Sequence, residues 1–224
     1  MPKKRGLTAS LMCEYQLCAQ GYERIAGIDE AGRGTWAGPV AAAAVCLPLN
    51  ERKLAKLLRG VRDSKMMTPQ ERDAMVDVVK DVVQAWGIGA ASNVEIDTLG
   101  IVPATKLAMT RALDTMNQQF PDCQPQALFL DGLIWPERVE VPQVSIIDGD
   151  ARSLSIAAAS VLAKVWRDER MIELDAEYPQ YGFAIHKGYG TAKHARALRL
   201  YGPCPLHRLT FKPVREIAAS GAWS

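Results

Sequence analysis

Two adjacent carboxylates followed by three glycines, within residues 25–40, constrain the fold of this chain more than any other feature. The segment reads IAGIDEAGRGTWAGPV, so a short apolar run leads into Asp29 and Glu30. Successive side chains of a regular strand point to opposite faces, and the two acids can converge on one ligand only if the chain bends there. Glycines permit such a turn because they tolerate positive φ. The segment therefore predicts a strand that stops at a charged, sharply turning loop.

The chemistry of this loop has two interpretations. Arg33 and the amides of Gly32 and Gly34 favour an anion. Carboxylates beside such amides suit divalent metal ions that lie between carboxylate and phosphate. In the alternative, Asp29 hydrogen-bonds its own backbone in a polar turn, and the glycines serve only geometry.

Acids recur at other predicted strand ends. The apolar run 126–131 ends in Asp131 before a glycine, and the run 141–148 is followed by Gly149 and Asp150. Ligand groups gather at strand ends in open α/β sheets. This recurrence favours a functional role for the acids.

Composition excludes several classes of protein. The 224 residues are enough for one sizeable core, and a net charge of +2 means that nucleic-acid binding would need local basic patches. Five cysteines without a CxxC pair fit a reducing compartment, so we expect a cytoplasmic protein. The apolar runs are too short or too interrupted to span a bilayer, and we expect no membrane association.

The remaining pattern alternates helices and strands. A short turn between the first two strands implies an antiparallel pair. Thr68 and Glu71 have capping-box spacing before a helix, and a basic helical stretch precedes the loop at 63–68. The first expected strand lies within 25–40 and stops at the charged loop, and the others are 39–48, 85–91, 126–131 and 141–148. The expected helices lie within 1–20, over 69–83, after Pro103 to Met116, and over 153–178.

Several polar residues outside the acids are candidate substrate contacts. Ser160, Lys164 and Asp168 fall on one stripe of the helix 153–178, which either carries an ordinary surface ion pair or lines the acidic cleft. Lys65 is either a solvated loop lysine or a phosphate contact. The chain after 178 is loop-rich and basic, and its interleaved rings and cations, including Lys187 and Tyr189, suit a nucleic-acid strand.

The three histidines, all in this last part of the chain, do not have the spacing of a zinc site. We expect them to be hydrogen-bonded structural groups. They are His186, His194 and His207.

The ordered motifs resemble those of the ribonuclease HII family. The resemblance covers nearly the whole length and is carried by GIDEAGRGTWAGPV, RDSKMMTP, ATKLAMTRAL, LFLDG, GDARSLSIAAASVLAKVWRDERM, YGFAIHKGYGT and GPCPLHRLTFKPV. It implies a ribonuclease H-like α/β fold, with a five-stranded mixed sheet flanked by helices and a helical C-terminal extension. It also implies an endonuclease that cuts the RNA strand of RNA–DNA hybrids and nicks 5′ of ribonucleotides embedded in DNA.

The resemblance also assigns roles to residues. The family's four acidic metal ligands correspond to Asp29, Glu30, Asp131 and Asp150. Asp148 lies two residues before Asp150, but the spacing to SIAAAS favours Asp150 as the ligand.

Two further motifs bear on the substrate. The glycine-arginine-glycine motif, which senses the ribose 2′-hydroxyl through backbone groups, corresponds to Gly32, Arg33 and Gly34. The tyrosine that stacks on the sugar of the following deoxynucleotide corresponds to Tyr189. The chain departs from the usual residues at Met67, Cys204 and Thr210, where leucine, threonine and serine are common.

Four carboxylates suit two divalent cations, Mg²⁺ or Mn²⁺, because hard cations choose oxygen ligands. We expect Asp29 to bridge the ions, Asp150 to hold the ion on the water side, and Glu30 with Asp131 to hold the other. In-line attack by water then gives a 5′-phosphate and a 3′-hydroxyl.

The resemblance predicts one domain with three parts. These are an N-terminal helical extension over 1–20, a ribonuclease H-like catalytic domain over 21–180, and a helical substrate-binding region over 181–224 packed on the same domain. We expect a monomer that binds hybrids and ribonucleotide-containing DNA, with a replication or transcription partner that the sequence does not identify.

Three rival functions stay open at this point. A ribonuclease HIII-like enzyme cleaves hybrids but nicks poorly at single ribonucleotides, and it carries an extra N-terminal domain. A non-catalytic hybrid-binding module would not need the full set of acids. A metabolic enzyme that binds a nucleotide phosphate would need a GxxxxGK[ST] or GxGxxG motif after a strand, and the chain has neither.

Overall fold

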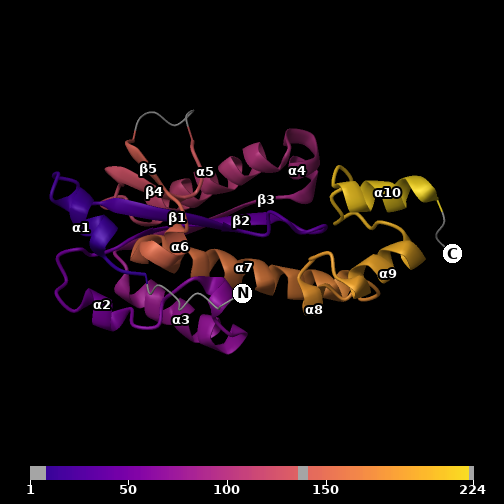
Figure 1. Cartoon of the computed structure of the whole chain (residues 1–224), viewed down its shortest axis with the longest axis horizontal. Coiled ribbons are helices and arrows are strands. Elements are labelled where there is room, and N and C mark those ends of the chain that lie inside the picture. The colour runs from indigo at the N-terminus through magenta and orange to yellow at the C-terminus, as the bar shows by residue number, and fades with distance from the viewer. Residues whose placement is uncertain (1–8, 136–140, 222–224) are drawn as a thin grey trace, which may run out of the picture.

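A five-stranded mixed sheet forms the centre of the computed structural model, which describes residues 9–135 and 141–221 (Figure 1). The strand order is β3-β2-β1-β4-β5. β1 pairs antiparallel with β2, and β2 with β3, whereas β4 runs parallel to both β1 and β5. The expected mixed sheet and antiparallel first pair are confirmed. The bounds are Ile25–Ala31 (β1), Val40–Cys46 (β2), Ala85–Ala91 (β3), Ala127–Asp131 (β4) and Gln143–Ile146 (β5).

Helices cover both faces of the sheet, and three further helices gather beyond one end of α7 (Figure 1). The expected long helices are confirmed, and in the described residues no helix has the length and apolar character needed to cross a bilayer. The bounds are Met12–Cys18 (α1), Leu54–Leu57 (α2), Pro69–Val82 (α3), Asn93–Leu99 (α4), Ile101–Gln119 (α5), Gly149–Arg152 (α6), Leu154–Glu177 (α7), Phe183–His186 (α8), Ala192–Tyr201 (α9) and Lys212–Ser220 (α10), with a short 3₁₀ helix η1 at Ser64–Met66.

Strand β2 separates two hydrophobic layers. Its even-numbered residues, such as Ala42 and Ala44, pack with α5, whereas Ala43 and Val45 pack with α7. Alanine favours helices in isolation, but a strand buried on both faces needs small side chains where two helices lie close. Burial therefore overrides propensity in this strand.

Helix α5 packs directly against Gly87 of β3. A Cβ atom added to Gly87 would lie 2.2 Å from the carbonyl oxygen of Ala112 in α5. The missing side chain is what allows the helix backbone to rest on the strand.

The N-terminal helix is tied to the start of α7 by Glu14, which is fully buried. One of its carboxylate oxygens accepts hydrogen bonds from the hydroxyls of Ser153 and Ser155 at 2.6 and 2.8 Å, and from the Ser155 amide at 2.9 Å. A carboxylate is stabilised at this end of a helix by the free amides there. The segment before α1 reinforces the link, because Ser10 forms a parallel bridge with Ser153.

Several predicted boundaries differ from the structure. The basic stretch after residue 51 contains only the four-residue α2, and β5 is shorter than 141–148. Helix α4 was not predicted, although Ser92 and Glu95 form a capping box that begins it. Helix α5 begins at Ile101 and includes Pro103 in its first turn, where proline is tolerated.

The bend predicted at the acid pair is wrong. Asp29 pairs with Ala43, Glu30 with Ala42 and Ala31 with Ala41, so β1 continues through both acids in a regular ladder. The turn begins only at Gly32, whose φ is +92°.

We predict that Gly87→Ala destabilises the fold by about 2 kcal/mol, because the added methyl must displace the backbone of α5. Urea unfolding measures this loss. Gly34→Ala is the matched control, since a Cβ there meets nothing within 4 Å. Equal stability of the two variants would contradict the close packing of α5 on β3.

Candidate active site

Three aspartates from separate elements converge at one edge of the sheet. Asp29 lies in β1, Asp131 ends β4 and Asp150 lies in α6, and one carboxylate oxygen of each is within 4.8 Å of the others. The parallel pairing of β1 with β4 brings two of them together, because Ile28 pairs with Leu130, the residue before each aspartate. The turn at residues 147–150 then brings Asp150 beside these two aspartates. Within this turn, Asp148 adopts a left-handed backbone conformation with a φ of 52°.

These acids are held close despite burial. Asp29 is 3% exposed and Asp150 5% exposed. Burial and the neighbouring charges of Glu30 and Asp131 raise the pKa of Asp29 well above its ordinary value, against the opposing hydrogen bond from Ser160. Burial raises the pKa of Asp131 as well, and the charge of Asp150 adds to that rise. The three carboxylates offer only oxygen donors, which fit a hard divalent cation.

Glu30 lies beside this group but is not part of it. Its Oε1 accepts a hydrogen bond from Arg33 at 3.1 Å, while its Oε2 is buried without a hydrogen-bond partner among the described residues. Burial raises the pKa of Glu30 and the Arg33 hydrogen bond opposes the rise. Alternation along the regular strand explains why only Asp29 joins the group of three. An acceptor left free in this way is available to a cation.

Lys65 supplies positive charge at the rim of the cluster. Its Nζ lies 3.0 Å from Oδ2 of Asp150, on a side chain that is 72% exposed. Burial of the ammonium acts to lower its pKa, but the hydrogen bond and charge of Asp150 outweigh this and raise it. Asp63 positions the segment by accepting a hydrogen bond from the Lys65 amide at 2.9 Å.

Ser160, expected as a substrate contact, lies behind Asp29 in the protein interior. It is 3% exposed, its hydroxyl hydrogen-bonds the Asp29 carboxylate, and its Oγ is 2.8 Å from Oγ of Ser64. The two serines connect η1 to α7 beneath the acids. Ser160 thus supports an acid rather than facing solvent.

Two buried arginines hold the glycine loop that follows the acids. Arg208 donates to the carbonyl oxygens of Gly32 at 2.7 Å, Arg33 at 2.9 Å and Gly38 at 2.9 and 3.0 Å. A Cβ on Gly32 would lie 1.9 Å from Nε of Arg167, so glycine is required there. Both arginines are fully buried.

Arg167 joins this loop to the one that carries Tyr189. It donates to the carbonyl oxygens of Pro39 at 2.8 Å and Lys187 at 2.9 Å, and to the hydroxyl of Thr35 at 2.8 Å. Burial lowers the pKa of Arg167 to about 10 and that of Arg208 to about 9, and both remain charged at neutral pH. Carbonyl dipoles stabilise these charges in place of carboxylates.

One turn before Arg167 in α7, Lys164 lies beside Tyr189. The Lys164 ammonium is 5.5 Å from the ring centroid of Tyr189 and 2.7 Å from Oδ1 of Asp168. Lys164 and Asp168 are only 16% and 17% exposed, so the pair is not an ordinary surface ion pair. Tyr189 is 44% exposed and borders a groove of about 680 Å³. Lys187 lines the same groove, although its Nζ bonds to the carbonyl oxygen of Ala184.

The sequence reading missed Arg167, Arg208 and Ser64. A signal existed for Arg167, because it shares a helical stripe with Ala163, Met171 and Leu174, which are all buried. A charged residue on an apolar stripe indicates a buried, fully bonded cation.

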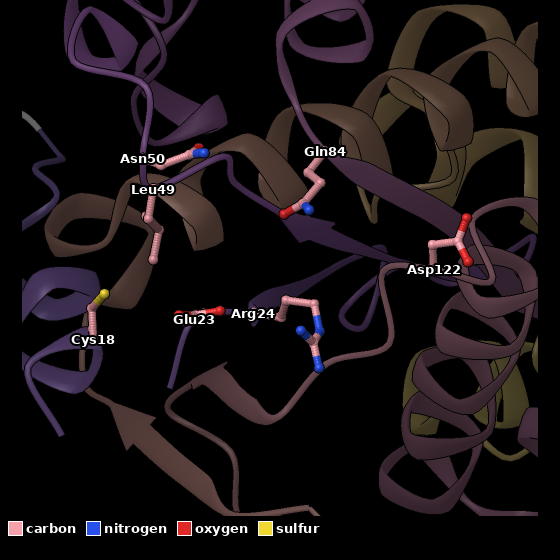
Figure 2. A pocket seen from close by; sticks show the side chains of 7 residues that line it. All are labelled: Cys18, Glu23, Arg24, Leu49, Asn50, Gln84 and Asp122. Atoms are coloured by element: carbon pink, nitrogen blue, oxygen red, sulfur yellow. The ribbon is translucent and has the colours of Figure 1, made fainter. Parts of the chain in front are cut away.

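A second hollow, of about 350 Å³, lies near the start of β1, at the opposite end of that strand from Asp29 (Figure 2). Its charged side chains are Glu23, Arg24 and Asp122. The Arg24 Nε already donates to the carbonyl oxygen of Gln124 at 2.8 Å. The converging acids and the exposed tyrosine lie away from this hollow.

Comparison with known proteins confirms the resemblance drawn from the motifs. The sequence model of the family described as Ribonuclease HII matches residues 26–214. A protein named Ribonuclease HII from Roseiflexus castenholzii is 53% identical over 207 residues, which cover 92% of this chain and 89% of the relative.

Solved structures share the fold. Ribonuclease H2 from Pyrococcus horikoshii OT3 has a TM-score of 0.64 at 24% identity, over 88% of this chain and 98% of that one. Bst-RNase HIII, solved in complex with Mn²⁺, has a TM-score of 0.70 at 19% identity, over 98% of this chain and 76% of that one. The predicted ribonuclease H-like architecture is thereby confirmed.

We predict that Arg208→Lys costs about 3 kcal/mol of stability, because one ammonium cannot serve three carbonyl groups in a fork geometry. The free energy of urea unfolding measures the loss, and hydrogen exchange of the amides in 32–38 should quicken. Arg199→Lys on the exposed face of α9 is the matched control, expected within about 0.5 kcal/mol of wild type. A tolerated Arg208→Lys would show that the loop does not depend on the guanidinium.

Proposed function

The chain belongs to the ribonuclease HII family of endoribonucleases, and we propose that it hydrolyses the RNA strand of RNA–DNA hybrids and nicks duplex DNA 5′ of embedded ribonucleotides. The observation that carries this proposal is the convergence of Asp29, Asp131 and Asp150, which have carboxylate oxygens within 4.8 Å of one another. The glycine loop at 32–38, which Arg208 holds by hydrogen bonds, follows directly after β1. A phosphodiester whose ribose approached that loop would present its phosphate to the acids.

We propose that two divalent cations, Mg²⁺ or Mn²⁺, are held by the three aspartates together with Glu30. Bound there, such ions supply the positive charge that activates the attacking water and stabilises the leaving oxygen. The all-oxygen donor set of the three aspartates and the unpartnered Oε2 of Glu30 support this assignment, because hard divalent cations prefer oxygen ligands. The product ends are a 5′-phosphate and a 3′-hydroxyl.

The protein groups around the acids have separate tasks in this proposal. Lys65 bonds Asp150 at the rim and offers its exposed ammonium to a phosphate. The loop at Gly32, Arg33 and Gly34 reads the 2′-hydroxyl, the group that distinguishes RNA from DNA. Arg208 and Arg167 keep the backbone of that loop rigid, which makes a single hydroxyl contact selective.

Tyr189, Lys164 and Lys187 bind the nucleotide that follows the ribonucleotide. The half-exposed ring of Tyr189 offers a face for stacking on a sugar, and the adjacent groove is lined by both lysines. Aromatic faces and cations together suit a nucleic-acid strand.

The rival functions have less support. Family membership favours ribonuclease HII activity over ribonuclease HIII activity. A binding module gains nothing from buried acids that repel one another, so a non-catalytic role leaves their position unexplained. A monomeric, cytoplasmic protein remains our prediction.

We predict that Asp150→Asn lowers Mg²⁺-dependent cleavage at least a hundredfold, because the water-side ion loses a charged ligand. The assay uses an end-labelled duplex with one ribonucleotide and maps the cut and its end groups. Asp131→Asn should behave likewise while the far-UV spectrum stays that of wild type.

Asp148→Asn is the matched control, two residues from Asp150 and outside the group of three. Asparagine also tolerates the left-handed backbone at this position. We expect activity within a few-fold of wild type. Wild-type activity in Asp150→Asn, or equal loss in both variants, would overturn the ligand assignment.

We predict that Tyr189→Ala lowers nicking at a lone ribonucleotide by roughly tenfold or more, because stacking contributes on the order of 1–3 kcal/mol. Cleavage of a long hybrid should fall less, since many alternative registers are available there. The two rates are measured side by side on matched duplexes. Proportional losses on both substrates would contradict a role at the junction.

A further inference from the structure

All three histidines of the chain are buried together behind the loop that carries Tyr189. The rings of His186 and His194 stack at 4.4 Å between centroids, and those of His194 and His207 lie 5.2 Å apart. Nε2 of His194 is 3.0 Å from Nε2 of His207. Two imidazole nitrogens at this distance share one proton, so one ring must donate and the other accept.

Backbone groups at the two ends decide the direction of this hydrogen bond. The amide of Cys204 donates to Nδ1 of His207 at 3.0 Å. The carbonyl oxygen of Cys204 lies farther from this nitrogen, at 3.3 Å, and already accepts from the His207 amide at 3.0 Å. The shorter contact makes Nδ1 an acceptor and places the proton of His207 on Nε2. His207 therefore donates to His194. The other nitrogen of His194, Nδ1, is 2.9 Å from the carbonyl oxygen of Tyr189, which can only accept. The result is a directed chain from Cys204 through His207 and His194 to Tyr189.

The ring of His186 is not part of this chain of hydrogen bonds. Nδ1 of His186 accepts from the amide of Gly188 at 3.2 Å, and its Nε2 therefore donates to the carbonyl oxygen of Tyr181 at 2.8 Å. The structure thus requires a different tautomer at His194, protonated on Nδ1, from that at His186 and His207.

Burial keeps the hydrogen-bonded histidines uncharged. It lowers the pKa of His194 to about 4 and that of His207 to about 3, and the charge of His194 adds to the effect on His207. Both rings are neutral at neutral pH, as a shared proton requires. At the other end of the hydrogen-bond chain, Sγ of Cys204 lies 3.1 Å from Nδ1 of His207.

This chain of hydrogen bonds ends at the backbone carbonyl oxygen of Tyr189, whose side chain borders the groove. The carbonyl oxygen of Tyr189 also accepts from the amide of Thr191 at 2.8 Å, so two donors hold this peptide from inside. Tyr189 is 44% exposed, and its ring centroid lies 5.5 Å from the Lys164 ammonium. Fixing the carbonyl fixes the direction in which the ring leaves the backbone.

We propose that His194 and His207 are positioning residues, a hydrogen-bonded relay that orients Tyr189 and thereby sets the preference of the enzyme for a lone ribonucleotide. This inference rests on the proposed function, because it assigns a cause to the nicking role of Tyr189. Neither imidazole touches the substrate in this arrangement.

Isosteric substitutions test the relay, because the amide nitrogen of asparagine takes the place of Nδ1 and that of glutamine the place of Nε2. His194→Asn keeps a donor for the Tyr189 carbonyl, whereas His194→Gln removes it. At His207 the order reverses, since His207→Gln keeps the donor to His194 and His207→Asn removes it.

We expect His194→Asn and His207→Gln to nick a lone ribonucleotide within about threefold of wild type. His194→Gln and His207→Asn should lose roughly tenfold, with smaller losses on a long hybrid. Thermal unfolding of all four variants accompanies the assay. If the losses follow stability alone, or affect both substrates equally, the relay is wrong.

The tautomers provide a readout that needs no nuclease activity. With three histidines in the chain, ¹⁵N NMR of the wild-type rings at neutral pH should show one ring protonated on Nδ1, assigned to His194, and two on Nε2. A spectrum with His194 protonated on Nε2 overturns the relay. Failure of the wild type to nick instead overturns the proposed function, while the spectrum still decides whether the chain of hydrogen bonds exists.

Discussion

Repulsion among three closely placed carboxylates, two of them buried and one partly buried, is the constraint on which the rest of this structure depends. One carboxylate oxygen of each of Asp29, Asp131 and Asp150 lies within 4.8 Å of the others, and burial and neighbouring charges raise the pKa of Asp29 and of Asp131. Only a rigid framework can hold such a group, and the parallel pairing of β1 with β4 supplies it. The apolar layers on both faces of β2 stabilise the fold and offset the free energy lost by holding these carboxylates together.

Buried positive charge is held near the acids as well. Arg167 and Arg208 are buried cations that bond to backbone carbonyl oxygens rather than to acids. Arg167 bonds Pro39, 128 positions away, and Arg208 bonds Gly38, 170 positions away, so the guanidinium groups join the glycine loop to the later part of the chain. Because the forks are rigid, the loop and the Tyr189 segment are held in a fixed relation.

Local signals predicted much of the fold. The capping box at Thr68 and the serine N-cap of α7 were visible because each involves residues a few positions apart. The equivalent box at Ser92 was overlooked, and with it α4. The bend at the acid pair was wrong because we assumed that both acids must face one ligand, whereas a regular strand lets Asp29 join the group and leaves Glu30 beside it.

The four acids could be named from the sequence, but their support could not. The contact between Ser64 and Ser160, and the bonds from Arg208 to the glycine loop, join residues 96 and up to 176 positions apart. No periodicity encodes such pairs. The histidines were expected to be structural, and their tautomers became readable only once the backbone donors around them were placed.

The buried Glu14 extends the influence of the first helix well beyond its own surroundings. Its carboxylate caps the helix that carries Ser160 and that follows directly from Asp150. Shortening the chain from its N-terminus past this residue would leave the Ser155 amide and the hydroxyls of Ser153 and Ser155 without their acceptor. In an enzyme trimmed in this way the place where Asp29, Asp131 and Asp150 converge would be less rigidly held, although no deleted atom belongs to it.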